Sequence, residues 1–147
     1  MLKNVLIASF LASIAGMVVC YLVCDLLGNQ IVLKGSYAVS EHLWRNPHLL
    51  TRNPQSLVKY FAAFLLTNAL WAYVFSVRAK SFEGSSVQKG TKFFFIFWLL
   101  TVPIHFWSWT LIPYPMKILL FNVFVYYLIL FLVIGGIIGK VCCRGNS

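Results

Sequence analysis

Residues 118–139 read ILLFNVFVYYLILFLVIGGIIG and contain no charged side chain. Such a run can cross the hydrocarbon core of a bilayer, about 30 Å thick, because a helix needs roughly 20 residues to do so. Three further apolar runs precede it, at 5–27, 57–77 and 93–112. Lipid offers backbone groups no partner, so each run must satisfy its own hydrogen bonds as a helix. We predict an all-α integral membrane protein, a single domain forming a four-transmembrane-helix bundle.

The composition agrees with lipid as the solvent. The 147 residues are 61% hydrophobic, and 12 basic plus 3 acidic side chains are too few to cover a water-soluble domain. The first run resembles a secretory signal, since Lys3 precedes it and small residues occur at 13–15. Residues 17–23 beyond that point remain strongly apolar, which favours an uncleaved first span.

The basic residues suggest which way the spans run. With both termini and the middle loop on one side, that side holds Lys3, Arg78, Lys80, Lys89, Lys92, Lys140 and Arg144. The other side holds fewer, mostly in the long loop 28–56. The positive-inside rule therefore predicts cytoplasmic termini and an external loop 28–56. We expect the cytoplasmic charges to contact anionic lipids, and no nucleic acid, because basic residues are scattered over both membrane faces.

Two spans carry small residues at helical spacing. In lipid, such a face lets another backbone approach closely. The positions that we expect to pack are Ala8, Ala12, Gly16 and Cys20 in the first span and Gly135 and Gly139 in the fourth. We interpret them as faces on which these two helices pack against each other. The alternative is an interface with another membrane-protein subunit or with a second copy.

Four polar residues interrupt or border the apolar runs. Asp25 and Lys59 lie near the external boundary of the first two spans, where they are placed to form an ion pair. Asn68 and Asn122 lie within spans, and interhelical hydrogen bonds, worth ~0.6 to 2 kcal/mol, account for both. An acidic residue in a membrane segment is also a functional candidate, so a role for Asp25 in a polar path stays open.

The third span is the least regular. Pro103 predicts a kink, because its ring removes a backbone donor and crowds the carbonyl of Leu99. His105 follows within one turn. Histidine ligates haem readily, so His105 is the candidate cofactor-binding residue, for haem or quinone. A second haem ligand would have to come from a loop or another copy, and a structural histidine with no bound cofactor is the simpler expectation.

The remaining candidates are loop and terminal residues. Glu41, His42 and His48 are capable metal ligands, but their spacing matches no recognised site, so we predict no metal. Cys142 and Cys143 lie between basic residues at the cytoplasmic end of the fourth span, where acylation is an open alternative.

Several short motifs point to one group of proteins. They are Leu43-Trp44-Arg45-Asn46-Pro47, Ala72-Tyr73-Val74-Phe75, Lys89-Gly90, Gly135-Gly136 and Gly139-Lys140. With these, the chain resembles small uncharacterised four-helix bacterial membrane proteins. The resemblance implies four spans and a bacterial inner membrane, and it carries no activity to any residue.

No catalytic constellation is visible in the sequence. There is no phosphate-cradling glycine loop, no nucleophile paired with a base and no dense intramembrane charge. We therefore expect a non-enzymatic accessory subunit of a larger membrane complex. The alternative is an oligomeric permease or channel for an ion or small solute, which would use Pro103, His105, Asn68 and Asp25. A haem- or quinone-binding subunit is the third interpretation.

Overall fold

The structure is a computed structural model that describes residues 2–23, 26–27, 54–111 and 116–143. Within these ranges every secondary-structure element is a helix, and there is no strand. The elements are α1 (Leu2–Val19), α3 (Pro54–Arg78), η3 (Ala79–Ser81), α4 (Ser86–Leu111), α5 (Met116–Phe121), η4 (Asn122–Tyr127) and α6 (Leu128–Cys142). Segments α5, η4 and α6 form one helix, whose middle segment η4 is π-helical. The predicted all-α class is confirmed.

Four helices are long and apolar enough to cross a membrane, as predicted. They cover Leu2–Val23, Phe61–Ser81, Ser86–Leu111 and Met116–Cys142. Their ends differ from the predicted runs most at the third span, which begins at Ser86 where the sequence suggested residue 93. Apolar runs mark only the part of a helix that lipid can cover, whereas the helix itself begins at its cap.

The cap of α4 explains that early start. The backbone N–H of Ser85 donates to Gln88 Oε1 at 2.9 Å, and the N–H of Gln88 donates to Ser85 Oγ at 3.3 Å. This reciprocal pair is a capping box, which satisfies two backbone donors that a helix start leaves open. Gly84, with φ +114°, supplies the left-handed conformation that the preceding turn requires.

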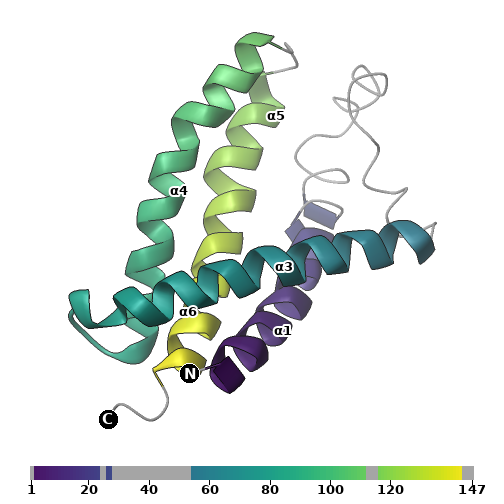
Figure 1. Cartoon of the computed structure of the whole chain (residues 1–147). Coiled ribbons are helices and arrows are strands. Elements are labelled where there is room, and N and C mark those ends of the chain that lie inside the picture. Colours follow the sequence, from purple (N-terminus) through teal and green to yellow (C-terminus); the bar gives the residue numbers. More distant parts are fainter. Residues whose placement is uncertain (1, 24–25, 28–53, 112–115, 144–147) are drawn as a thin grey trace.

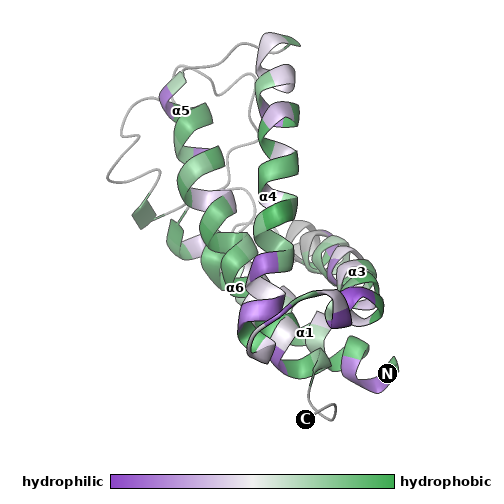
Figure 2. Cartoon of the chain, turned by 90° about the vertical axis from the view of Figure 1, so that its left-hand side faces the viewer, coloured by the Kyte–Doolittle hydropathy of each residue, from purple (hydrophilic) through white to green (hydrophobic). Residues whose placement is uncertain are grey.

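The helices form two pairs, α4 with the α5–α6 helix and α1 with α3, and the two pairs cross each other (Figure 1). Helix α4 runs beside α5 and α6, and α3 lies across them, with α1 in contact with both α3 and α6. The start of α1 and the end of α6 lie at the same end of the molecule (Figure 1). Polar residues gather at this end, while α6 is hydrophobic over most of its length and α4 is hydrophobic mainly in its middle (Figure 2).

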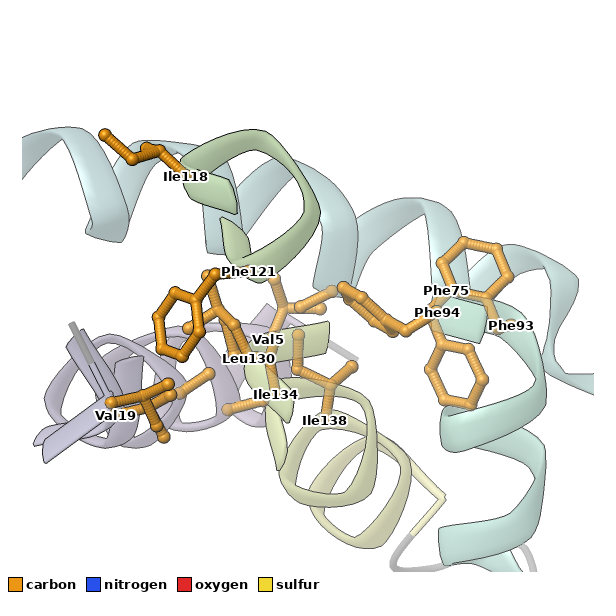
Figure 3. Close-up of a cluster of buried hydrophobic side chains, with 14 residues drawn as sticks. Val5, Val19, Phe75, Phe93, Phe94, Ile118, Phe121, Leu130, Ile134 and Ile138 are labelled. Carbon is orange, nitrogen blue, oxygen red and sulfur yellow. The ribbon is translucent and has the colours of Figure 1, made fainter. Parts of the chain in front are cut away.

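A single hydrophobic core joins the four spans (Figure 3). Val5 of α1 lies against Leu130 and Ile134 of α6, and Phe75, Phe93 and Phe94 gather at the other end of the cluster. The rings of Phe75 and Phe93 are 5.4 Å apart in edge-to-face geometry. More of the chain's core comes from α1 and the fourth span, whose most apolar stretches are 39% and 44% buried, than from α3 and α4, at 17% and 11%.

Glycines allow α4 and α6 to touch backbone to backbone. A Cβ atom added to Gly135 would lie 2.8 Å from the carbonyl oxygen of Gly90, and one added to Gly139 would lie 2.9 Å from Gly90 Cα. Both distances are shorter than any real Cβ contact. The expected packing of the first span on the fourth is present, since α1 contacts α6. Gly135 and Gly139, however, face α4 and not the first span. Their partner is Gly90, for which no packing role was predicted because it precedes the apolar run 93–112.

Candidate functional site

The second half of α4, which contains Pro103, lies against a π-helical stretch of the fourth span. A second π-helical stretch, at residues 20–23 and 26–27, lies at the end of the first span. Helix α4 continues through Pro103, and the neighbouring span is π-helical over Asn122–Tyr127. No feature of the sequence predicted the π-helical segment Asn122–Tyr127. π-Helical turns are rare and frequently occur at functional sites. The contact between the second half of α4 and η4 is therefore the first candidate site.

Two side chains of α4 hold η4 in place. The indole Nε1–H of Trp98 donates to the carbonyl oxygen of Val123 at 2.8 Å, and both residues are buried. A buried indole needs such an acceptor. Two helical turns further along the same face, the ring of His105 stacks on that of Tyr127, with centroids 4.5 Å apart and an interplanar angle of 23°.

The surroundings of His105 are aromatic. Its ring is half-buried, and Tyr127 also contacts Tyr126, with ring centroids 4.9 Å apart. The backbone carbonyl of His105 accepts a hydrogen bond from Ser108 Oγ at 2.9 Å. The arrangement therefore presents one histidine on a tyrosine face. The other two histidines, at 42 and 48, which are the candidates for a second haem ligand within one copy, lie outside the described residues.

Asn68 belongs to a different helix contact. This residue is only 2% exposed, and its Nδ2 donates to Ser13 Oγ of α1 at 3.1 Å. Ser13 Oγ in turn donates to the carbonyl oxygen of Ser9 at 2.6 Å. The expected interhelical hydrogen bond of Asn68 thus joins α3 to α1. Asn122 is half-buried at the start of η4, away from this contact.

The small face of the first span is buried within the chain. Ala8 and Ala12 are fully buried, and Gly16 faces Phe64 of α3 and Leu130 of α6. Cys20 is half-buried. This face therefore receives α3 and α6 together.

For several of the predicted site residues, either the residue itself or its expected partner lies outside the described residues. Lys59 is exposed, and its expected partner Asp25 lies outside the described residues. The same is true of the loop 28–53 with Glu41, His42 and His48. Among the residues that the structure describes, no three His, Cys, Asp or Glu side chains gather as metal ligands. Cys142 and Cys143 are half-buried free thiols at the end of α6.

The permease interpretation needs one path through its polar residues. His105 lies at the contact of α4 with η4, and Asn68 lies at the contact of α3 with α1. The two side chains therefore belong to separate interfaces within one copy. A polar path remains a sequence-based prediction.

The outer face of α3 differs from the other exposed helix faces. Its centre carries three small exposed side chains: Ala62, Ala63 and Thr67. The exposed faces of α1 and α4 instead carry large apolar side chains, such as Phe10 and Leu11 on α1 and Ile96 and Leu100 on α4. Bulky residues suit lipid, whereas small ones let a second helix approach.

No protein-family model, no curated protein and no solved structure matches this chain.

Proposed function

We propose that this protein is a non-enzymatic accessory subunit, which binds a transmembrane helix of a different membrane protein through the outer face of α3. That face is defined by Ala62, Ala63, Leu66, Thr67 and Leu70, all exposed within the span Phe61–Ser81. The observation that carries the proposal is the cluster of small side chains at the centre of this otherwise apolar face.

The spacing of the small residues fits helix association. Ala63 and Thr67 are four positions apart, so they lie one above the other on the helix surface. Small residues at this spacing are typical of transmembrane helices that pack closely, because van der Waals contact replaces the hydrophobic drive that water supplies. On this face the large exposed side chains of Leu66 and Leu70 lie beside the small ones, and helices pack by fitting such large side chains into the spaces above small ones.

The hydroxyl group of Thr67 also favours a partner helix on this face. Thr67 is exposed within the span, and its hydroxyl makes no hydrogen bond within the described part of the chain. The hydroxyl groups of Ser76 and Thr101, in contrast, donate to carbonyl oxygens of their own helices. A hydroxyl facing lipid is more stable when a neighbouring helix offers an acceptor.

Site-specific photocrosslinking in native membranes tests the proposal. A photoreactive amino acid at Ala63 should form one discrete adduct with another membrane protein. The same group at Leu100, on the exposed face of α4, is the matched control and should give lipid adducts only. Introducing Ala62→Leu beside the Ala63 probe should reduce the protein adduct about tenfold, because a bulky side chain separates the two helices.

Three results would count against the proposal. Equal protein adducts from positions 63 and 100 would mean random collision. An adduct that is insensitive to Ala62→Leu would mean that α3's outer face does not form the interface. An adduct of this chain with a second copy of itself would replace the accessory subunit by a homo-oligomer, and would favour the permease interpretation.

A further inference from the structure

A cavity of about 560 Å³ lies at the turn between α3 and α4. Its polar lining comes from Lys80 and Lys89 and from the serines 85 and 86, with Cys143 at the end of α6 on the far wall. The described residues that line it include no acidic side chain. The volume falls in the range of small-molecule sites, about 300 to 1,000 Å³.

The two lysines carry uncompensated charge. Within the described part of the chain, the side-chain ammonium group of neither Lys80 nor Lys89 forms an ion pair or a hydrogen bond. Their neighbour Lys92 differs, because its Nζ donates to the backbone carbonyl of Glu83 at 3.0 Å. Glu83 is the acidic residue of this turn, but it is exposed and does not line the cavity. The cavity is therefore strongly cationic.

Hydrogen bonds within the chain determine the shape of the turn that lines the cavity, without a bound ligand. The capping box between Ser85 and Gln88 and the left-handed Gly84 determine the course of the turn. In that box Ser85 Oγ accepts a hydrogen bond from the backbone of Gln88, so its own O–H is available to donate. Two ammonium groups and hydroxyl donors around one space suit an anion with several acceptor oxygens.

The cavity also lies at a suitable depth. The second span ends at Ser81, and the buried Phe93 follows Lys89 by about one helical turn in α4. The lysines therefore lie where the apolar helices end, at the level of lipid headgroups. We propose that this cavity binds a phosphate-bearing anion between Lys80 and Lys89, with Ser85 and Ser86 as hydroxyl donors. This site is independent of the partner face on α3.

Binding measurements on the purified full chain test this proposal. Native mass spectrometry would follow titration with phosphatidylglycerol and, separately, with phosphatidylcholine, and calorimetry would follow inorganic phosphate. The variant K80Q/K89Q should bind the anion about 30-fold more weakly, since each lysine near an anionic lipid contributes about fivefold. The matched control K3Q/K140Q removes two charges from the same end of the molecule without touching the cavity, and should change binding less than about twofold.

The two sources of phosphate give different results. Tight binding of phosphatidylglycerol that depends on Lys80 and Lys89 would identify a lipid headgroup. Binding of inorganic phosphate with the same dependence, and no preference for phosphatidylglycerol, would identify a free phosphate. The proposal is overturned if neither anion binds the wild type, or if both double variants weaken binding equally, because the effect would then be one of net charge.

Discussion

Helix α4 meets the fourth span in two different ways along its length. Near its start, Gly90 touches Gly135 and Gly139 of α6 through the backbone. Further along, Trp98 and His105 contact η4 through large side chains. The first contact depends on the absence of a Cβ atom, and the second on directed polar and aromatic groups. In lipid, burying apolar surface between helices contributes little free energy, so helices are held together by close backbone packing and by polar or aromatic contacts such as these two.

The largest expected effect is at the glycine contact. Gly90→Ala should lower the free energy of unfolding by more than about 3 kcal/mol, because the new Cβ would overlap the carbonyl oxygen of Gly135 and α4 would have to move away. Unfolding in mixed micelles measures this. In the control Gly136→Ala, the added Cβ meets Val87 Cγ1 at an ordinary 3.7 Å, so stability should stay unchanged or rise by up to about 1 kcal/mol. Equal changes in the free energy of unfolding for Gly90→Ala and Gly136→Ala would mean that the close backbone contact at Gly90 does not determine stability.

A smaller effect is expected at the indole. Trp98→Phe keeps an aromatic ring but leaves the buried carbonyl of Val123 without this donor, at a cost of about 1 to 3 kcal/mol. Trp107→Phe is the control, since Trp107 is 69% exposed and should change stability by less than about 0.5 kcal/mol. If the two variants unfold alike in the same micelles, the hydrogen bond does not stabilise η4.

The smallest effect is expected at the stacked pair. A double-mutant cycle with His105→Leu and Tyr127→Leu should give a coupling energy of about 0.5 to 1.5 kcal/mol, the usual range for aromatic pairs. His105→Phe should retain most of this coupling, because it keeps a ring at the contact. A coupling energy near zero would mean that the two rings lie side by side without stabilising the protein.

The candidate site was partly predictable. His105 and Pro103 stood out because a histidine and a proline are unusual in an apolar run. Their counterpart did not, since residues 122–127 read as ordinary helix and a π-helical turn has no sequence signature of its own. Trp98 was visible as an aromatic residue, but its acceptor is a backbone carbonyl, and any residue can offer one.

The outer face of α3 was missed for a related reason. Ala62, Ala63 and Thr67 attract no notice in a span that also contains buried small residues. They become informative only when the fold shows that they are exposed, while the similar stripe with Ala8 and Ala12 is buried.

The sequence by itself determined the four membrane helices, because run length and the backbone's need for hydrogen bonds in lipid leave no other solution. Only the tertiary structure decided which faces meet: Gly90 with Gly135 and Gly139, and His105 with Tyr127. The reason is physical, since lipid-facing and helix-facing surfaces are both apolar, so no hydropathy pattern separates them.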